Sequence, residues 1–234
     1  MCGRFALGIP KRRAEAFFDA PFPGGLDGCN IPPGSDVPVV LADAGARTVR
    51  AMRWGLAPPI AAADGPRPIN ARAETAAAKP YFRRAMAERR CLVPARAFYE
   101  WADGPGGKRP YAMAPLAGGA AADVFALAGL WERRQDDGRT LETFAVLTCA
   151  ANADAAAVHH RMPVILAPEA FALWLGPAGV GDVAHMLAPW PDGALAVWPV
   201  SGAVNDPANQ GPELLEQVPG PEPGKAPPRQ GRLV

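Results

Sequence analysis

The sequence predicts an α+β fold in a single domain, and three observations support this. The 234 residues are enough for one large domain, and 49% hydrophobic with 20% charged residues is typical of a globular protein with a sizeable core. Strand-like and helix-like runs are mixed along the chain, with no internal repeat. The composition changes only after Pro207, where Pro, Gly and polar residues dominate. We therefore expect one domain over residues 1–206 and a disordered tail over 207–234.

Four segments carry helix signals. The first is amphipathic and runs from Pro10 to about Ala20, and the second has Pro80 at its first turn. The third and fourth are short, at 168–176 and 179–187. Between the first two helices, the segment 56–75 is rich in proline and is expected to be mostly loop.

Strand signals occupy most of the remaining chain. Apolar or alternating runs predict strands at 37–43, 47–55, 123–134, 142–150 and 195–201. The segment 91–115 reads as strands joined by a hairpin, with the glycine-rich stretch from Asp103 to Lys108 at its tip.

The first residues and the cysteines restrict the class of protein. The stretch "MCGRFALGIPKRRAEAFF" has no apolar core typical of a signal peptide, and no apolar run reaches membrane-spanning length. We therefore expect a cytoplasmic protein with no membrane partner. The four cysteines have no C-x-x-C or Cys/His spacing, so we expect neither a metal site nor a cofactor. Cys91 and Cys149 lie in apolar runs and are expected to be buried thiols.

Charge is distributed unevenly along the chain. Residues 1–100 hold 15 Lys and Arg against 9 Asp and Glu, a net charge of +6, whereas residues 101–234 hold 9 against 14, a net charge of −5. A basic N-terminal half is compatible with a polyanion-binding face but does not require one.

Cys2 would become the N-terminal residue if Met1 were removed. An N-terminal cysteine carries an amine with a pKa of about 8 and a thiol with a pKa of about 8.5, so both nucleophilic forms exist near neutral pH. Such a pair reacts with aldehydes and acyl groups.

Three polar motifs could carry chemistry. In "NARAET", Asn70 and Arg72 would share one face of an extended segment, although a helix start with Glu74 in its first turn is the simpler interpretation. In "FYEW", Glu100 is either exposed or a buried proton donor and acceptor, and the two are evenly balanced. In "HHRMP", the histidines are either surface residues or a proton-transfer group.

Trp54 and Leu56 in "RWGL" have two interpretations. A core tryptophan followed by a turn is the commoner case. In an exposed loop, however, the indole could stack on an unpaired base and the leucine could act as a wedge.

Seven motifs in order give a specific resemblance. "MCGRF", "RWGL", "NARAET", "RRCLVPARAFYEW", "AGLWE", "HHRMPVIL" and "PVSGAVN" together resemble the SOS response-associated peptidase (SRAP) family of abasic-site processing proteins, over residues 1–206. The resemblance implies a β-barrel-like core flanked by helices and a groove for single-stranded DNA. "NIPPGSDVPVV" departs from the family pattern in a loop outside the catalytic set.

The resemblance also implies roles for individual residues. Cys2 would be the nucleophile, Asn70 would orient it, Glu100 would be the acid and base, and His159 would assist. His160 occupies the variable place in the histidine motif. Arg4, Arg72 and Arg161 would contact phosphates, and Trp54 and Leu56 would lie near the bases that flank the lesion.

The chemistry of an N-terminal cysteine agrees with the implied activity. The open form of an abasic deoxyribose is an aldehyde, which the amine converts to a Schiff base and the thiol then closes to a thiazolidine. We expect this crosslink, accompanying abasic-site lyase and Met1-removing peptidase activities, a monomer, and association with the nucleoid through single-stranded DNA. A glutamine amidotransferase with an N-terminal cysteine and a non-catalytic single-strand-binding module are the alternatives.

Overall fold

The computed structural model describes residues 2–43, 45–62, 64–104, 106–136 and 138–220. Its strands are β1 (Phe5–Ala6), β2 (Asp36–Asp43), β3 (Ala46–Trp54), β4 (Asn70–Arg72), β5 (Arg90–Ala95), β6 (Ala97–Gly104), β7 (Gly107–Ala117), β8 (Ala120–Ala121), β9 (Phe125–Asp136), β10 (Arg139–Ala150), β11 (Arg161–Pro163), β12 (Ile165–Leu166) and β13 (Leu195–Pro199). Its helices are α1 (Lys11–Phe18), α2 (Ala73–Ala76), α3 (Pro80–Glu88), α4 (Ala153–Ala156), α5 (Phe171–Leu175) and α6 (Val180–Val183). Single-turn 3₁₀ helices are η1 (Pro168–Ala170), η2 (Ala184–Met186), η3 (Gly202–Asn205) and η4 (Pro212–Leu215).

A closed barrel forms the centre of the fold. Strand β10 pairs with β3, and the order continues through β2, β5 and β9 back to β10. All these pairings are antiparallel except β10 with β3, which is parallel at Thr143↔Arg53 and Phe144↔Trp54. Closure removes the free sheet edges, and apolar side chains such as Val39, Met52 and Phe144 are fully buried. The expected α+β class with a barrel core flanked by helices is confirmed.

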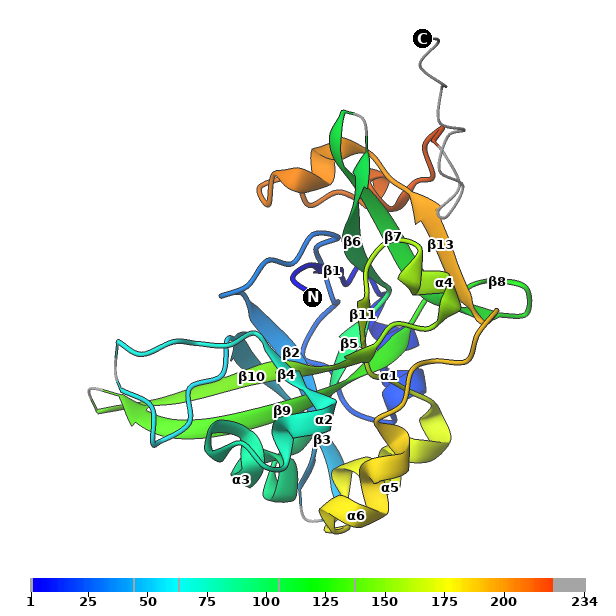
Figure 1. Cartoon of the computed structure of the whole chain (residues 1–234). Coiled ribbons are helices and arrows are strands. Elements are labelled where there is room, and N and C mark those ends of the chain that lie inside the picture. The colour runs from blue at the N-terminus through cyan, green and yellow to red at the C-terminus, as the bar shows by residue number, and fades with distance from the viewer. Residues whose placement is uncertain (1, 44, 63, 105, 137, 221–234) are drawn as a thin grey trace, which may run out of the picture.

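A smaller sheet packs beside the barrel. Its strand order is β1-β6-β7-β13, with β8 pairing β7. The hairpin expected between Asp103 and Lys108 is present, because β6 and β7 pair as far as Gly104↔Gly107. In Figure 1 this sheet lies above the barrel, α3, α5 and α6 lie on the opposite side, and the N-terminus lies between the two sheets.

The segment after Pro207 is ordered where the structure describes it. Leu214 is buried, and the Trp198 indole donates a hydrogen bond to the Leu215 carbonyl at 2.9 Å. The Val218 amide also bonds the Pro199 carbonyl at 3.0 Å. The prediction of a disordered tail is therefore wrong for residues 207–220. A few apolar side chains are enough to order this segment, because they pack on the surface of the folded domain. Residues 221–234 lie outside the described part.

No helix in the described part of the chain is long and apolar enough to cross a membrane.

Candidate active site

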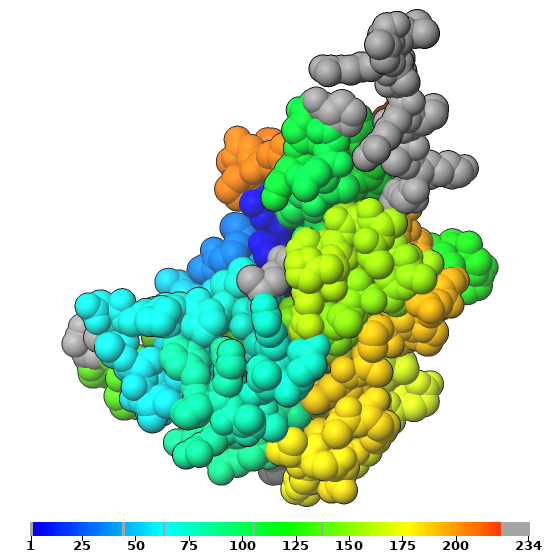
Figure 2. Space-filling model, in the orientation of Figure 1, coloured from blue at the N-terminus to red at the C-terminus, as the bar shows by residue number. Residues whose placement is uncertain are grey.

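The four side chains expected to act in catalysis lie close together. Cys2 precedes β1, Asn70 begins β4, Glu100 is on β6, and His159 follows α4. Figure 2 shows the blue N-terminal residues in a hollow between the green hairpin, the orange C-terminal segment and the yellow-green segment that follows β10. The barrel and the smaller sheet thus each contribute to one site, and the roles of these residues stay predictions.

Asn70 holds the backbone of Cys2. Its Nδ2 donates a hydrogen bond to the Cys2 carbonyl oxygen at 2.8 Å. Asn70 is itself positioned by β4, which pairs with β10 at Asn70↔Val146. The extended segment and the helix start expected in "NARAET" are both present, because the short strand β4 is followed by α2 with Glu74 in its first turn.

The thiol of Cys2 is fully buried. Burial raises its pKa well above the usual range, the negative charge of Glu100 raises it further, and the backbone N–H of Arg4 acts in the opposite direction. In this environment the thiol is protonated at neutral pH. It therefore needs a proton acceptor before it can act as a nucleophile.

Glu100 lies close enough to Cys2 to influence its thiol, and its carboxylate lies near His159. The carboxylate is 4% exposed, so the interpretation of Glu100 as an exposed residue is wrong. Its Oε1 lies 4.0 Å from Nδ1 of His159. The same Nδ1 lies 3.0 Å from the backbone nitrogen and 3.1 Å from the carbonyl oxygen of Arg161, so the ring is held whether Nδ1 accepts or donates a proton. His160 points into solvent, and the neighbouring His159 lowers its pKa.

The three arginines expected to bind phosphate differ in their surroundings. Arg72 is exposed and has no ion-pair partner among the described residues. Arg161 forms a two-pronged ion pair with Glu74, at 2.6 and 3.0 Å, and also donates to the Thr148 carbonyl at 2.5 Å. This pairing lowers the pKa of Glu74. Arg161 therefore joins α2 to β10, and a phosphate would have to compete with Glu74 for it.

Arg4 also has a structural role that the sequence did not predict. Its Nη1 donates to Asn30 Oδ1 at 2.6 Å and to the Val204 carbonyl at 3.0 Å. Asn30 is fully buried, and its Nδ2 donates to the carbonyls of Val204, Asp206 and Asn209. Arg4 therefore forms a clamp between the N-terminal segment and the C-terminal segment, and its contact with a phosphate stays a prediction.

The predicted contacts of Trp54 and Leu56 with DNA bases are wrong. The two side chains are 1% and 0% exposed. The Trp54 indole donates to the Ile69 carbonyl at 2.9 Å and stacks on Phe144, with ring centroids 6.3 Å apart. It also contacts the edge of Phe5, at 5.0 Å. The indole thus supports the strand that follows Cys2 and has no face left for a base.

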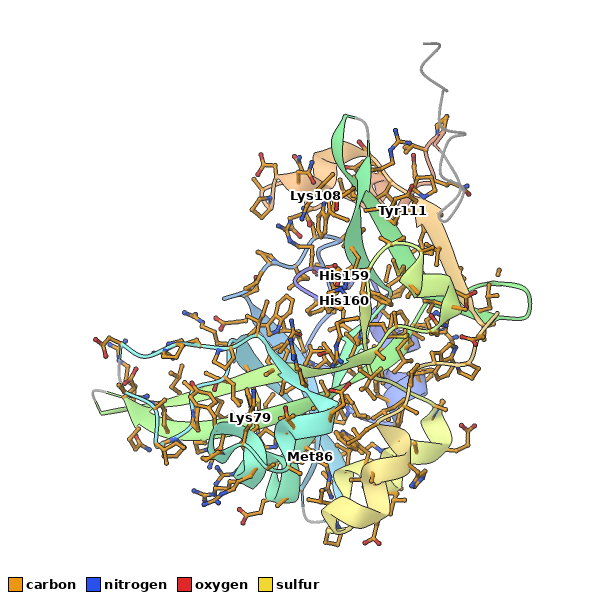
Figure 3. The ribbon with its side chains drawn as sticks, viewed as in Figure 1. Lys79, Met86, Lys108, Tyr111, His159 and His160 are labelled. Atoms are coloured by element: carbon orange, nitrogen blue, oxygen red, sulfur yellow. The ribbon has the colours of Figure 1, made fainter. Side chains whose placement is uncertain are left out.

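A cleft beside Glu100 and His159 contains residues that the sequence did not single out. It has a volume of about 690 Å³ and is lined by Glu100, Trp101, Lys108, His159 and Asn205. Figure 3 shows Lys108 on the hairpin, above the two histidines. Trp101 follows Glu100 in "FYEW", and this adjacency was a signal in the sequence of its place beside the site.

Within the described residues, no group of three or more His, Cys, Asp or Glu side chains is arranged to hold a metal ion, and all four cysteines are free thiols.

The family is decided by a match to the model "SOS response associated peptidase (SRAP)" over residues 1–207. The chain belongs to this family. It is 34% identical over 226 residues to abasic site processing protein YoqW of Bacillus subtilis, covering 92% of this chain and 99% of that protein. It is 33% identical over 221 residues to abasic site processing protein HMCES of Gallus gallus, covering 81% of this chain and 66% of that one.

Solved structures agree with the fold of this SRAP chain. A Bacteroides thetaiotaomicron protein matches with a TM-score of 0.81 at 22% identity, covering 93% of this chain and all of that one. A Bordetella bronchiseptica protein matches with a TM-score of 0.74 at 27% identity, covering 86% of this chain and all of that one. None of these matches supports the glutamine amidotransferase alternative.

Proposed function

We propose that this SRAP protein captures abasic sites in single-stranded DNA as a covalent crosslink to Cys2, after removal of Met1. The observation that carries the proposal is the placement of Cys2 beside Glu100, with its backbone held by Asn70. The names of its relatives, abasic site processing proteins, support the same substrate.

The first steps use Glu100 as an acid. A protonated Glu100 carboxyl would donate its proton to the ring oxygen O4′ as the C1′ hydroxyl loses its proton to water, which breaks the C1′–O4′ bond and yields the aldehyde. The free α-amine of Cys2 then adds to C1′, and loss of water leaves an imine.

The second stage uses Glu100 as a base. The thiol of Cys2 transfers its proton to the Glu100 carboxylate as sulfur bonds to C1′, and the carboxyl group passes this proton to the imine nitrogen, which becomes the amine of a five-membered thiazolidine. His159, 4.0 Å from Glu100, would relay protons between this group and solvent, so that Glu100 is protonated for the first stage. A non-catalytic binding module would not require this placement of a thiol, a carboxylate and an imidazole.

Two side activities follow from the same arrangement. If the thiol does not close onto the imine, removal of a proton from C2′ expels the 3′ phosphate by β-elimination, which is abasic-site lyase activity. The buried Cys2 thiol with Glu100 as its proton acceptor is also suited to attack the Met1 carbonyl, so that the Met1–Cys2 peptide bond breaks as a thioester forms. Hydrolysis of this thioester by water would release Met1 and make its removal a self-processing reaction.

Single strands are the preferred partner on physical grounds. An unpaired lesion needs no base-pair opening, and exposed Arg72 together with the +6 net charge of residues 1–100 favours a phosphate backbone. Affinity should therefore fall steeply with salt and exceed the affinity for intact duplex.

The test is denaturing electrophoresis of the protein with an abasic single-stranded oligonucleotide. Wild type should form a heat-stable adduct. Cys2→Ser retains the amine but not the thiol, so the stable adduct should vanish while some strand cleavage survives. A chain with an uncleavable extension before Cys2 retains the thiol but not the free amine, and a normal adduct yield from it would refute the aminothiol mechanism.

A further inference from the structure

A second groove lies on the face of the smaller sheet that is turned away from the catalytic carboxylate. Glu100 is opposite Tyr111 on β7, and Leu116 lies five residues further along the same strand. Because successive side chains of a strand alternate between its two faces, Leu116 lies on the other face. The described residues that line this groove are all different from those that line the catalytic cleft. In Figure 1, β8 and β13 lie on the far side of β7 from the N-terminus.

Apolar and small side chains form most of this groove, which has a volume of about 540 Å³. Its floor contains Leu116, which is 38% exposed, and Trp198, which is half-buried. Trp198 is opposite Ala112 of β7, so it shares the face of Leu116, and its indole is held by the hydrogen bond to the Leu215 carbonyl. Residues 119–122, with three alanines and a glycine, also line the groove and leave this apolar floor accessible.

The edge of the sheet beside the groove has an unused position for main-chain pairing. Strand β13 is last in the strand order, and its even-numbered residues bond to β7, so its odd-numbered residues direct their N–H and C=O groups to the free edge. The Leu195 amide bonds Asp154 at 3.2 Å, and the Pro199 carbonyl accepts from Val218 at 3.0 Å. Val197 lies between them, lines the groove, and has no hydrogen-bond partner at this edge among the described residues. Such an edge position suits an extended peptide.

Arg96 gives the groove a positive charge. The charged side chains that line it are Arg96 and Asp123. Asp123 is neutralised by a two-pronged ion pair with Arg13, at 2.9 to 3.1 Å. Arg96 is half-buried, donates from Nη1 to the Gly8 carbonyl at 3.2 Å, and forms no ion pair within the described part of the chain. A guanidinium has five N–H donors and binds a carboxylate through two of them, so Arg96 retains donors for such a group.

The free edge and the guanidinium are a short peptide apart. Arg96 directly precedes β6, and β6 is two strands from β13 in the sheet, so the two positions are separated by about 10 Å across the strands. An extended peptide covers this distance with about three residues. One peptide can therefore pair with Val197, lay a side chain over the apolar floor, and reach Arg96.

We propose that this groove binds the C-terminal end of a partner protein, with an apolar last side chain on Leu116 and Trp198 and the terminal carboxylate on Arg96. A peptide end is favoured over a nucleic acid, because the described lining combines one uncompensated cation with an apolar floor and a main-chain pairing position. The inference goes beyond the proposed function, since none of the residues proposed for catalysis takes part in it.

The first experiment measures binding of a fluorescein-labelled peptide by fluorescence anisotropy. The peptide ends in Thr-Val-Leu with a free carboxylate, and its control is the same peptide with a terminal amide. Wild type should bind the free acid about 10- to 100-fold more tightly than the amide. Arg96→Gln should bring this ratio near one, whereas Arg139→Gln, at an exposed position on β10 outside the groove, should preserve it. A ratio near one in wild type, or binding of neither peptide, would overturn the proposal.

Two variants test the floor and the edge. Leu116→Asp places a negative charge at an exposed position of the floor and should weaken binding of the free acid at least about 10-fold. Val197→Pro removes the N–H at the free edge, where Pro199 shows that β13 accommodates proline. It should weaken both peptides about 2- to 10-fold and preserve their ratio. Thermal melts check that both variants fold, and unchanged binding of the free acid in either folded variant would overturn the proposal.

A third measurement identifies the occupant. A chain ending at Gly220 should bind the peptide as the full chain does. Tighter binding by the shortened chain would assign the groove to residues 221–234 of this chain and overturn the assignment to a partner. Displacement of the peptide by an undamaged single-stranded oligonucleotide would assign the groove to a phosphate and overturn it as well. Crosslinking to abasic DNA is measured separately, so failure of the proposed function would leave the peptide result unaffected.

Discussion

The side-chain amide of Asn70 lies 2.8 Å from the backbone carbonyl oxygen of Cys2, and this bond joins two segments 68 residues apart in sequence. The bond restrains the backbone of Cys2 and leaves its thiol available. It also places the start of the chain at the edge of the barrel, because Asn70 belongs to a strand paired with β10.

Replacing Asn70 with Ala should slow crosslinking about 10- to 100-fold at saturating DNA, because the nucleophile loses its positioning bond. The measurement is a single-turnover time course, with a thermal melt to show that the fold persists. Arg72→Ala is the comparison from the same strand: it should weaken DNA binding and leave the saturated rate near that of wild type. An unchanged rate in Asn70→Ala would show that the bond has no role in positioning.

Replacing Glu100 with Gln keeps the shape and removes the ionisable group. Crosslinking should slow about 10²- to 10⁴-fold, since proton transfer to O4′ and from the thiol is lost, while DNA binding persists. Electrophoretic time courses and fluorescence anisotropy measure the two quantities. Glu88→Gln, an exposed position on α3 paired with Arg84, should behave like wild type. Equal slowing in both variants would indicate a general charge effect.

The adjacent histidines form a natural pair of variants. His159→Ala should impair crosslink formation or reversal, because His159 faces Glu100 at 4.0 Å, whereas the exposed His160 should tolerate the same change. Rates of adduct formation and of adduct loss after dilution would be compared for both. Greater sensitivity at His160 would mean that the family motif has been aligned one position off.

Truncation should separate the ordered part of the C-terminal segment from the rest. A chain ending at Asp206 loses the buried Leu214, at about 1.5–3 kcal/mol, and the Asn209 carbonyl that accepts from Asn30, at about 1–3 kcal/mol. Its melting temperature should fall by about 10 °C or more. A chain ending at Gly220 retains all these contacts and should melt like the full chain. Equal melting temperatures for the two truncations would show that residues 207–220 do not stabilise the domain.

Stability should fall at alkaline pH because of the buried thiols. Burial raises the pKa of Cys149 to about 11 and that of Cys91 further, both from an ordinary value of 9.0. A raised thiol pKa favours folding below pH 9, and the advantage is lost as pH rises from 9 toward 11, by at most about 1.4 kcal/mol per pH unit for each thiol. Urea unfolding at pH 8 and pH 10.5 measures this loss. Cys149→Ala should show a shallower decline, and an identical decline would exclude this thiol as a cause.

Local signals in the sequence were sufficient to predict most of the helices and strands. The hairpin between β6 and β7 follows from its glycine-rich tip, and α3 begins at the expected Pro80. The aminothiol chemistry of Cys2 also follows from its position alone. These predictions depend on residues close together in the chain, because turn geometry and the presence of an amine beside a thiol are local properties.

The tertiary structure decided which polar and aromatic side chains face the site. Glu100 is buried because the N-terminal segment and His159 cover its face of β6, and Trp54 is buried because the barrel closes around it. Arg4 joins the N-terminal and C-terminal segments because it donates a hydrogen bond to the carbonyl of Val204, which is 200 residues away in sequence. The alternating pattern of a strand shows that its two faces differ, but the segments packed against each face determine which one is buried. Those segments are distant in sequence, so only the folded chain determines which side chains reach the cleft.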